Sequence, residues 1–502
     1  IGGMQGDTGG FPDWVQDAVF YQIFPDRFAR SARVPKPGNL EAWDAPPTVH
    51  GYKGGDLLGV VERLDHLTEL GVTALYLNPV FASGANHRYH THDYFQVDPM
   101  LGGDAALAAL LTAAHARGMR VVLDGVFNHA SRGLLQFHDI LENGSASPYV
   151  DWFHVNRFPL NAYGGGPLGY EAWWGLPALP KLNVGNPAVR EFLWRVGEHW
   201  LERGIDGWRL DVPNEIDDDA FWQEFRRRCR AVNPEAYLVG EIWTGAERWL
   251  HGDIFDGVMN YPLTRAIFGL VGRDLATDEI ARSGLDGVEA LGAKRFVKRV
   301  EGLLGAYPRG AVYSQLNLLG SHDTPRVRTS LGGDGAALRQ AWLLLFALPG
   351  APCVYYGDEI GLEGGHDPHC RAGMPWGRRD AWDEELLAFM RRLIRLRTEQ
   401  PALRRGETRL SAPRDDLVVV ERWLEGGDGA GAVGGRGAAS DARAAGQRLY
   451  ALVNTAGAAA TVPAAALPPG RYRDLLSGGE VVQARGAALV PARGGVLLAP
   501  WS

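Results

Sequence analysis

Short apolar runs recur along most of the chain, and each is followed by a polar loop or an amphipathic stretch. The runs lie at 17–24, 72–77, 119–126, 207–210, 236–239, near Val258, 314–318 and 353–356. Between them, apolar residues repeat with helical spacing, as at 56–70, 104–117, 187–203 and 218–232. Uniformly apolar strands that alternate with helices indicate a parallel sheet. Eight such strands predict an α/β fold of the TIM-barrel type, (β/α)8.

Two regions depart from this alternation and suggest further domains. Residues 130–185 are irregular and rich in Gly, Pro, Trp and Tyr, so they predict an inserted, loop-rich domain after strand three. After residue 405 short alternating strands predict a C-terminal antiparallel β-sandwich domain, interrupted by a low-complexity, disordered stretch at 426–446. The predicted division is a tail at 1–13, a barrel at 14–129 and 186–405, an insert at 130–185 and a C-terminal domain at 406–502.

Composition and charge exclude several classes of protein. The formal net charge is -8 and no run of Lys or Arg is longer than three residues, which argues against nucleic-acid or acidic-membrane partners. Cys229, Cys353 and Cys370 lack the spacing of a zinc site and fit a reducing compartment. The longest apolar run, 341–356, is broken by prolines, and no signal peptide is visible. We therefore expect a cytoplasmic protein without a membrane segment.

Polar residues gather where four of the predicted strands end. A barrel places function at the carboxyl ends of its strands, and these ends carry Asp124, Arg209, Asp211, Glu241, His322 and Asp323. Arg209 and Asp211 are two positions apart on a strand, so both side chains face one side. Carboxylates from separate strands in one pocket match the needs of glycoside cleavage, which uses a nucleophile and a proton donor.

The motifs around these residues resemble the signature regions of the α-amylase superfamily, glycoside hydrolase family 13. They are Asp124-Gly-Val-Phe-Asn-His129, Gly207-Trp-Arg-Leu-Asp211, Gly240-Glu-Ile-Trp243 and Ser321-His-Asp323. Leu179-Pro-Lys-Leu-Asn183, Val212-Pro-Asn-Glu215 and Val258-Met-Asn-Tyr261 resemble the neopullulanase, cyclomaltodextrinase and maltogenic amylase group. The resemblance covers residues 14–405 and, more loosely, the C-terminal domain.

The resemblance implies a role for each site residue. Asp211 is expected to be the nucleophile, Glu241 the general acid/base and Asp323 the group that binds sugar hydroxyls at the transition state. Arg209 is expected to position Asp211, and Asp124 to be structural. The other implied substrate-binding residues are His87, Tyr89, His129 and His322 around the cleaved sugar, and Glu215 and Trp243 on the leaving-group side.

Retention of configuration follows from these roles. We expect Arg209 to keep Asp211 ionised, and a desolvated, electronegative site to keep Glu241 protonated. The two carboxyl groups should lie roughly 5–5.5 Å apart, as in retaining enzymes.

Three departures from the group limit what the resemblance implies. The group usually has an extra β domain before the barrel and dimerises through it, whereas this chain enters the barrel near Trp14, so we expect a monomer or an oligomer without that exchanged-domain dimer. The Asn/Asp-rich calcium run is missing from 29–38 although Gly54-Gly-Asp56 remains, so no cofactor or essential metal is expected and calcium stays an open possibility. His90 stands where the group commonly has Asp, and we assign no role to His90 or His92.

Three functions compete at this point. The leading one is a hydrolase of short α-glucans, whether linear, cyclic or branched, with α-1,4 cleavage and α-1,6 cleavage left open. The second is a transglycosylase or isomerase that passes the same covalent intermediate to a sugar. The third is a non-catalytic sugar-binding or transporter-associated relative, which the presence of Asp211, Glu241 and Asp323 disfavours.

Overall fold

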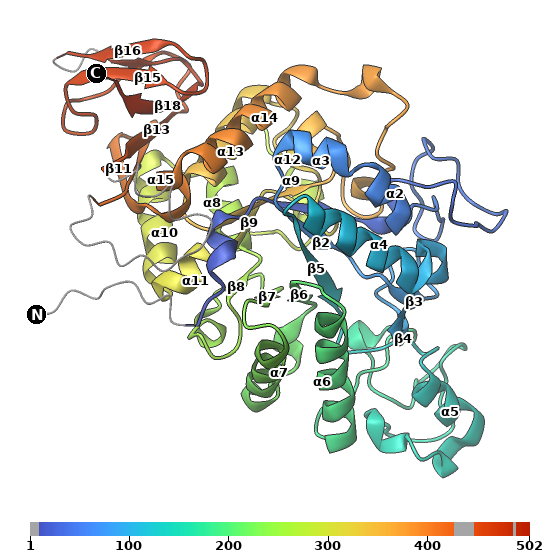
Figure 1. Cartoon of the computed structure of the whole chain (residues 1–502). Coiled ribbons are helices and arrows are strands. Elements are labelled where there is room, and N and C mark those ends of the chain that lie inside the picture. The colour runs from blue at the N-terminus through green and yellow to red at the C-terminus, as the bar shows by residue number, and fades with distance from the viewer. Residues whose placement is uncertain (1–9, 426–445, 485–487, 502) are drawn as a thin grey trace, which may run out of the picture.

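The structure, a computed structural model, describes residues 10–425, 446–484 and 488–501. The predicted disordered stretch falls at residues 426–445, outside the described residues, with only Gly446 inside them. Two well-separated β regions are visible in Figure 1, one at the centre of the molecule and one at its C-terminal end.

The central sheet is an eight-stranded parallel barrel, as predicted. Its strands are β1 (Phe20–Ile23), β2 (Ala74–Leu77), β5 (Arg120–Gly125), β6 (Gly207–Leu210), β7 (Tyr237–Gly240), β8 (Gly257–Val258), β9 (Leu316–Leu318) and β10 (Ala351–Tyr355). They pair in the order β8-β7-β6-β5-β2-β1-β10-β9. A parallel bridge between Met259 and Leu316 joins the two ends of this order and closes the barrel. The predicted fold class is therefore confirmed.

Helices cover the outside of the barrel. They are α1 (Pro25–Phe28), α2 (Leu57–Glu62), α3 (Leu64–Leu70), α4 (Gly103–Ala116), α6 (Pro187–Glu202), α7 (Asp219–Val232), α8 (Tyr261–Val271), α9 (Thr277–Arg282), α10 (Ala293–Gly305), α11 (Arg309–Tyr313), α12 (Val327–Ser330), α13 (Gly335–Ala347), α14 (Glu384–Glu399) and α15 (Pro401–Arg405). The prediction of one helix at 56–70 was wrong, because Arg63 leaves helical geometry and separates α2 from α3. Gly71 ends α3 in the left-handed region, with φ 95°, as its position predicted.

The long loops contain more structure than their composition indicated. β3 (Phe81–Ser83) and β4 (Thr91–Val97) form a hairpin within the loop after β2. The segment 130–185 holds α5 (Leu135–Asn143) and isolated antiparallel bridges such as Phe153 with Leu182. Another bridge, between His129 and Lys181, joins this segment to the end of β5. The segment is thus tied to the barrel at the edge where its strands end.

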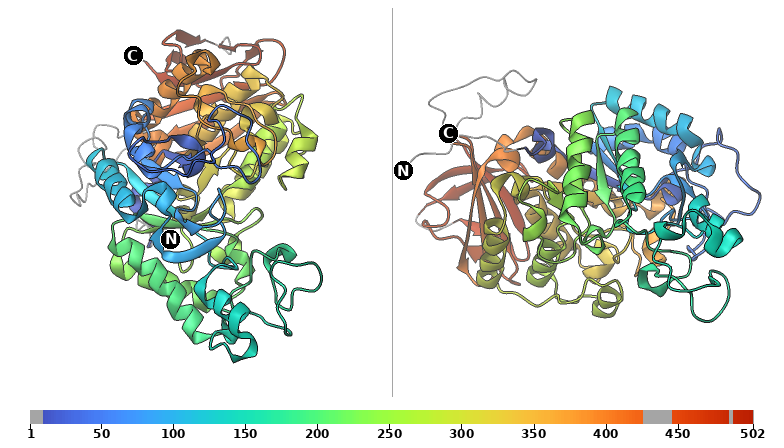
Figure 2. Two further views of the ribbon diagram at one scale, coloured as in Figure 1. Left: turned by 90° about the vertical axis from the view of Figure 1, so that its right-hand side faces the viewer. Right: turned by 90° about the horizontal axis from the view of Figure 1, so that it is seen from below.

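The C-terminal region is antiparallel, as predicted. A six-stranded sheet has the order β11 (Glu407–Arg414), β12 (Leu417–Trp423), β13 (Arg448–Asn454), β18 (Gly495–Pro500), β15 (Gly470–Asp474) and β16 (Glu480–Gln483), and β14 (Ala460–Thr461) pairs with β17 (Leu489–Val490). Alternate residues of β12 face opposite ways: Val418 and Val420 join the core shared with the barrel, whereas Leu417 and Val419 join a separate core beneath β14 and β17. Figures 1 and 2 show this sheet and α5 at opposite ends of the molecule.

The domain boundaries at residues 14, 130, 186 and 406 stay a prediction. Within the described part of the chain, every helix is too short or too polar to cross a membrane.

Candidate active site

The predicted site residues lie along the edge of the barrel where its parallel strands end. Asp124 lies on β5 and Arg209 on β6, and the two are paired in the strand register. Asp211 follows β6 directly, Glu241 follows β7, and Asp323 follows β9 after a short turn. The fold thus brings together side chains that are far apart in the sequence.

Arg209 is the centre of the site. Its side chain is fully buried, and Nη1 donates hydrogen bonds to Asp124 Oδ1 at 2.9 Å and to Asp211 Oδ1 at 3.0 Å. Nη2 lies 2.9 Å from Glu241 Oε2 as an ion pair, without the alignment of a hydrogen bond. One guanidinium therefore contacts three carboxylates, which are 1%, 8% and 5% exposed for Asp124, Asp211 and Glu241. The prediction that the side chains of Arg209 and Asp211 face the same side is confirmed by their contact.

The turn after Asp211 holds Glu241. Val212 has φ 34°, a left-handed conformation that is strained for a β-branched residue. Its backbone N–H donates to Glu241 Oε2 at 3.1 Å. Trp243 Nε1 donates to the other oxygen of Glu241 at 3.1 Å, and its ring stacks on Tyr261 at 3.8 Å. The position of Glu241 is therefore set by both a strained backbone turn and a packed aromatic ring.

Asp323 is the most accessible of the three predicted catalytic carboxylates. Its side chain is 32% exposed, and Oδ2 lies 3.1 Å from His322 Nε2. Arg371 Nη2 donates to Asp323 Oδ1 at 3.2 Å, while Arg371 Nε donates to the His322 carbonyl oxygen at 2.8 Å. Arg371 was missed by the sequence reasoning. It lies in the loop after β10, where no spacing in the sequence sets it apart.

Tyr89 links the two sides of the pocket. Its hydroxyl lies 2.6 Å from Asp124 Oδ2 and 2.8 Å from His322 Nε2, and its ring stacks on His322 at 5.4 Å. Gln22 and Asn78, on and after the first two strands, lie 2.9 Å and 3.2 Å from His322 Nδ1. These two amides were also missed, because an isolated Gln or Asn at a strand end carries no distinctive spacing.

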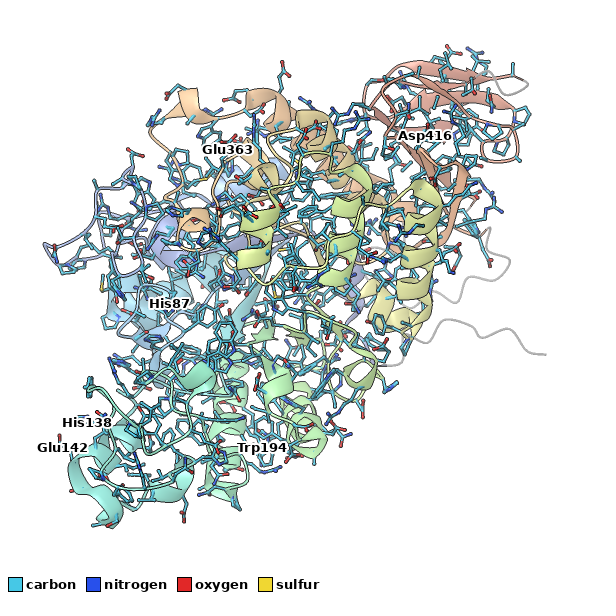
Figure 3. All side chains as sticks on the ribbon, turned by 180° about the vertical axis from the view of Figure 1, so that it is seen from behind. His87, His138, Glu142, Trp194, Glu363 and Asp416 are labelled. Atoms are coloured by element: carbon cyan, nitrogen blue, oxygen red, sulfur yellow. The ribbon has the colours of Figure 1, made fainter. Side chains whose placement is uncertain are left out.

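The predicted substrate-binding residues His129, His87 and Glu215 lie in different parts of the site. His129 Nε2 lies 3.9 Å from Asp211 Oδ2. His87 Nδ1 accepts the Tyr89 backbone N–H at 3.1 Å, and Figure 3 shows His87 in the body of the molecule, away from Asp416 of the C-terminal sheet. Glu215 is exposed, and its carbonyl oxygen accepts a hydrogen bond from Lys181 at 3.3 Å. Glu215 is thus the predicted residue that lies at the rim.

Burial and mutual repulsion control the protonation of the carboxylates. Burial raises the pKa of Glu241; Arg209 opposes this shift, and the Asp323 charge adds to it. Burial also raises the pKa of Asp211 well above its usual range, and the Glu241 charge adds more than Arg209 removes. Arg209 is shared by three acids and offsets only part of this rise, so the ionised state of Asp211 stays a prediction.

The histidines of the site are neutral near pH 7. Burial lowers the pKa of His129 to about 3 and lowers the pKa of His87 and His322 well below the usual value. Neutral imidazoles can donate and accept hydrogen bonds at the same time. They therefore suit recognition of hydroxyl groups better than recognition of anions.

The residues near Asp56 do not fit a calcium ion. The Lys36 ammonium lies 3.0 Å from Asp56 Oδ2 and donates to the Met100 carbonyl oxygen at 2.5 Å. The Asp56 oxygens also accept backbone N–H groups from Ser31 at 3.0 Å and Gly59 at 2.7 Å. Because hard cations need several free oxygen ligands, an internal ammonium takes the place of a metal here. Among the described residues, no three His, Cys, Asp or Glu side chains are arranged to hold a metal.

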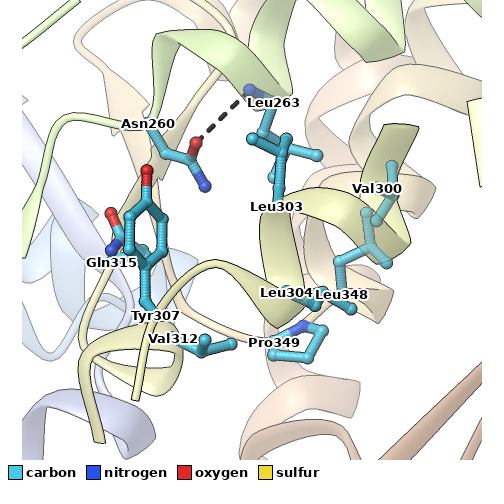
Figure 4. Close-up of a pocket in the computed structure, with 10 residues that line it drawn as sticks. All are labelled: Asn260, Leu263, Val300, Leu303, Leu304, Tyr307, Val312, Gln315, Leu348 and Pro349. Atoms are coloured by element: carbon cyan, nitrogen blue, oxygen red, sulfur yellow. Dashed lines mark hydrogen bonds between the residues drawn. The ribbon is translucent and has the colours of Figure 1, made fainter. Parts of the chain in front are cut away.

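A small internal cavity behind the barrel is not a substrate site. It has a volume of about 10 Å³ and is drawn in Figure 4, where Asn260 accepts the Leu263 N–H. Its other lining residues are mainly apolar side chains of α8, α10 and the loops beside them. A space of this size holds one water at most. A larger pocket of about 390 Å³, lined by residues such as Arg33, Gln96 and Ala105, contains none of the predicted site residues either. The candidate active site is therefore argued from the contacts around Arg209 at the strand ends.

Comparison with known proteins agrees with this geometry. Residues 22–406 match the family Alpha amylase, catalytic domain. A cyclomaltodextrinase from a Bacillus species is 46% identical over 397 residues, which is 79% of this chain and 68% of that relative. The crystal structure of a protein from Thermus thermophilus is 49% identical and covers 97% of this chain and 100% of its own, with a TM-score of 0.88. A debranching enzyme from Nostoc punctiforme is 43% identical and covers 97% of this chain and 99% of its own, with a TM-score of 0.85.

Proposed function

Because the chain belongs to the α-amylase family, we propose that it hydrolyses α-glucosidic bonds in short α-glucans and retains the anomeric configuration. The observation that carries this proposal is the contact of one buried guanidinium with Asp211 and Glu241, with Asp323 on the next-but-one strand of the same edge. A nucleophile, an acid and a third carboxylate in one pocket are the groups that this chemistry needs.

Cleavage begins at the anomeric carbon. Asp211 attacks this carbon and forms a covalent glycosyl ester, while Glu241 gives its proton to the departing glycosidic oxygen. The reaction needs Glu241 protonated and Asp211 ionised, and burial of Glu241, which raises its pKa, favours a proton on this carboxyl. Asp323 binds the sugar hydroxyls and stabilises the positive charge that develops on the ring. His322 and Arg371 hold Asp323 in place for this role.

The second half of the reaction returns the enzyme to its starting state. Glu241, now ionised, removes a proton from water, and the resulting oxygen nucleophile attacks the glycosyl ester and frees Asp211. Glu215 and Trp243 line the side from which this water, or a competing sugar, approaches. His87, Tyr89 and His129 bind the sugar that is being cleaved.

The preferred bond is the open part of this proposal. The names of the two relatives, cyclomaltodextrinase and debranching enzyme, support activity on cyclic α-1,4 and on branched α-1,6 substrates respectively. Chromatography of products from maltotriose, pullulan, cyclodextrin and panose separates these preferences. Repeating the assay at high sugar concentration separates hydrolysis from transglycosylation, since only the latter yields products longer than the substrate.

Replacement of the acid tests the mechanism. We expect Glu241→Gln to lower kcat by about 10²–10⁴-fold, because Gln cannot donate the proton, while maltohexaose binding measured by calorimetry stays close to wild type. Wild-type turnover in this variant would contradict the assigned role.

The stereochemical course provides a separate test. A proton NMR time course of wild-type hydrolysis should show the α-anomer as the first product. Early appearance of the β-anomer would exclude the glycosyl-ester mechanism and leave a single displacement by water.

The cysteines bear on the cellular setting. Cys229, Cys353 and Cys370 are buried and unpaired thiols, which supports work in a reducing, cytoplasmic environment. The expected partner is an oligosaccharide substrate, with the protein as a monomer or a homo-oligomer.

A further inference from the structure

Three aromatic rings form a continuous stack that leads outward from the pocket. The His129 ring stacks on Trp173 with centroids 5.1 Å apart and an interplanar angle of 23°. Trp173 stacks on Trp174 at 4.5 Å and 12°. His129 also lies 3.9 Å from Asp211. The stack therefore begins beside the predicted nucleophile and ends at Trp174.

Trp174 is presented to solvent at a cost to the fold. It is 80% exposed, the highest value among the large hydrophobic side chains that the structure describes. Its φ of 52° is left-handed, a conformation that costs an ordinary side chain of order 1 kcal/mol. Neither the exposure nor the strain helps the chain to fold, so they point to a ligand at this ring.

The turn that carries Trp174 is held firmly against the barrel edge. The Trp173 N–H donates to the Leu179 carbonyl oxygen at 3.0 Å, and the Gly175 N–H donates to the Ala172 carbonyl oxygen at 3.0 Å. Two residues beyond Leu179, Lys181 is bridged to His129. The ring is thus fixed relative to the pocket before any ligand arrives, which lowers the entropic cost of binding.

We propose that Trp174 is an outer sugar-binding platform, on which a glucosyl ring of a longer α-glucan stacks after the chain leaves the pocket past His129. An α-glucan is the expected ligand because the three rings run without a break from the vicinity of Asp211 to Trp174. A substrate chain that reaches Asp211 and extends outward therefore meets these rings. A flat indole suits the apolar face of a pyranose. This inference rests on the proposed function and adds a preference for chain length to it.

Chain-length dependence tests the platform. For Trp174→Ala we expect kcat/KM on maltohexaose to fall about tenfold, through KM with kcat unchanged, while kcat/KM on maltotriose stays at the wild-type value. Trp174→Phe keeps a smaller ring, so its kcat/KM on maltohexaose should lie between the values of wild type and Trp174→Ala. Because the side chain is largely exposed, these variants are expected to fold, and circular dichroism checks that they do.

Tyr163→Ala is the matched control. Tyr163 is 70% exposed in the same segment, but its ring packs on Arg132 at 4.1 Å and lies outside the stack. We expect this variant to match wild type on both substrates. Equal losses for Trp174→Ala on maltotriose and maltohexaose, or no loss on either, would overturn the proposal.

Wild-type turnover of maltotriose tests the proposed function by itself. If wild type fails to turn over either sugar, calorimetric titration of maltohexaose into wild type and Trp174→Ala decides the platform independently. Weaker binding in the variant supports the platform, and equal or absent binding overturns it.

Discussion

At the scale of single residues, the site is governed by the sharing of one cation among several acids. Arg209 contacts Asp124, Asp211 and Glu241 at 2.9–3.0 Å. Its charge cannot neutralise all three, and burial raises the pKa of each acid. Small changes in the hydrogen bonds to one carboxylate should therefore move the protonation of the pair and show in the pH dependence of catalysis.

Trp243→Phe tests this directly. The Trp243 N–H hydrogen bond stabilises the ionised form of Glu241 and so lowers its pKa. Without this donor the pKa of Glu241 rises, the acid stays protonated to higher pH, and the basic limb of the kcat/KM profile moves to higher pH. Tyr261→Phe is the control, since it keeps the ring beneath Trp243 and loses only the contact with Ser321. A limb that stays in place, or moves to lower pH, would contradict this account.

The sequence predicted which residues gather in the site but not how their charges balance. Asp211, Glu241 and Asp323 follow apolar runs, so the barrel alone places them together. The sharing of Arg209 depends on three-dimensional distances that no spacing reveals. For the same reason the sequence did not predict Arg371, Gln22 and Asn78. Their contacts with His322 or Asp323 span more than forty residues of sequence.

At the scale of elements, the barrel depends on close approach between neighbouring strands. A Cβ on Gly207 would lie 2.2 Å from the Tyr237 carbonyl oxygen and 2.9 Å from its nitrogen. Both atoms are backbone, so they cannot move aside without displacing β7. This glycine therefore sets the spacing of the strand that presents Arg209 and Asp211.

We expect Gly207→Ala to lower the free energy of unfolding by about 3 kcal/mol and to reduce kcat, because the site residues on β6 shift with the strand. Urea titration followed by fluorescence measures the first effect. Gly302→Ala in α10 is the matched control: its Cβ meets nothing within 4 Å, and the change should be neutral or stabilise by up to about 1 kcal/mol. Equal behaviour of the two variants would show that β6 tolerates the extra atom.

Some elements could not be predicted from the spacing of apolar residues. α2 and α3 keep one apolar stripe across the break at Arg63, so the pattern reads as a single helix. The hairpin of β3 and β4 packs on α6, where the Phe81 ring stacks on Trp200. The helix α5 packs within its own segment, where the Phe137 ring lies against Phe153 and Tyr170. Their sequences look irregular because tertiary packing, not intrinsic propensity, decides their structure.

At the scale of the molecule, an internal lysine stabilises the loop that leads from β1 to α2. Lys36→Met would leave the buried Asp56 carboxylate without its cation, and removing one partner of a buried pair costs about 3–5 kcal/mol. We expect urea titration to show a fall of this size in the free energy of unfolding. Lys298→Met, at an exposed position, should change it little. Chelation with EDTA should leave wild-type stability unchanged. A clear loss of stability on chelation would show that a bound metal, and not Lys36, supports this loop.

The C-terminal sheet and the barrel share one core, so they should unfold together. Val418, Val420 and Leu497 of the sheet belong to the same buried cluster as the barrel strands. Arg422 of β12 crosses the junction and donates to the carbonyl oxygens of Ala347 at 2.6 Å and Gly406 at 3.0 Å. Separate melting of the sheet would expose this apolar face and remove the Arg422 hydrogen bonds across the junction.

Arg422→Met measures how strongly the junction couples the two regions. Methionine fills part of the space but leaves the Ala347 carbonyl oxygen without its donor, which costs about 1–3 kcal/mol. The Gly406 oxygen keeps the hydrogen bond from the Tyr313 hydroxyl. We expect the melting temperature of the whole protein to fall, with loss of activity and loss of the calorimetric peak at the same temperature. Arg473→Met, on an exposed position of β15, is the control and should leave the melting temperature unchanged. Two resolved transitions in wild type, with only the lower one shifted by Arg422→Met, would show that the C-terminal sheet is an independent unit and not part of the barrel's core.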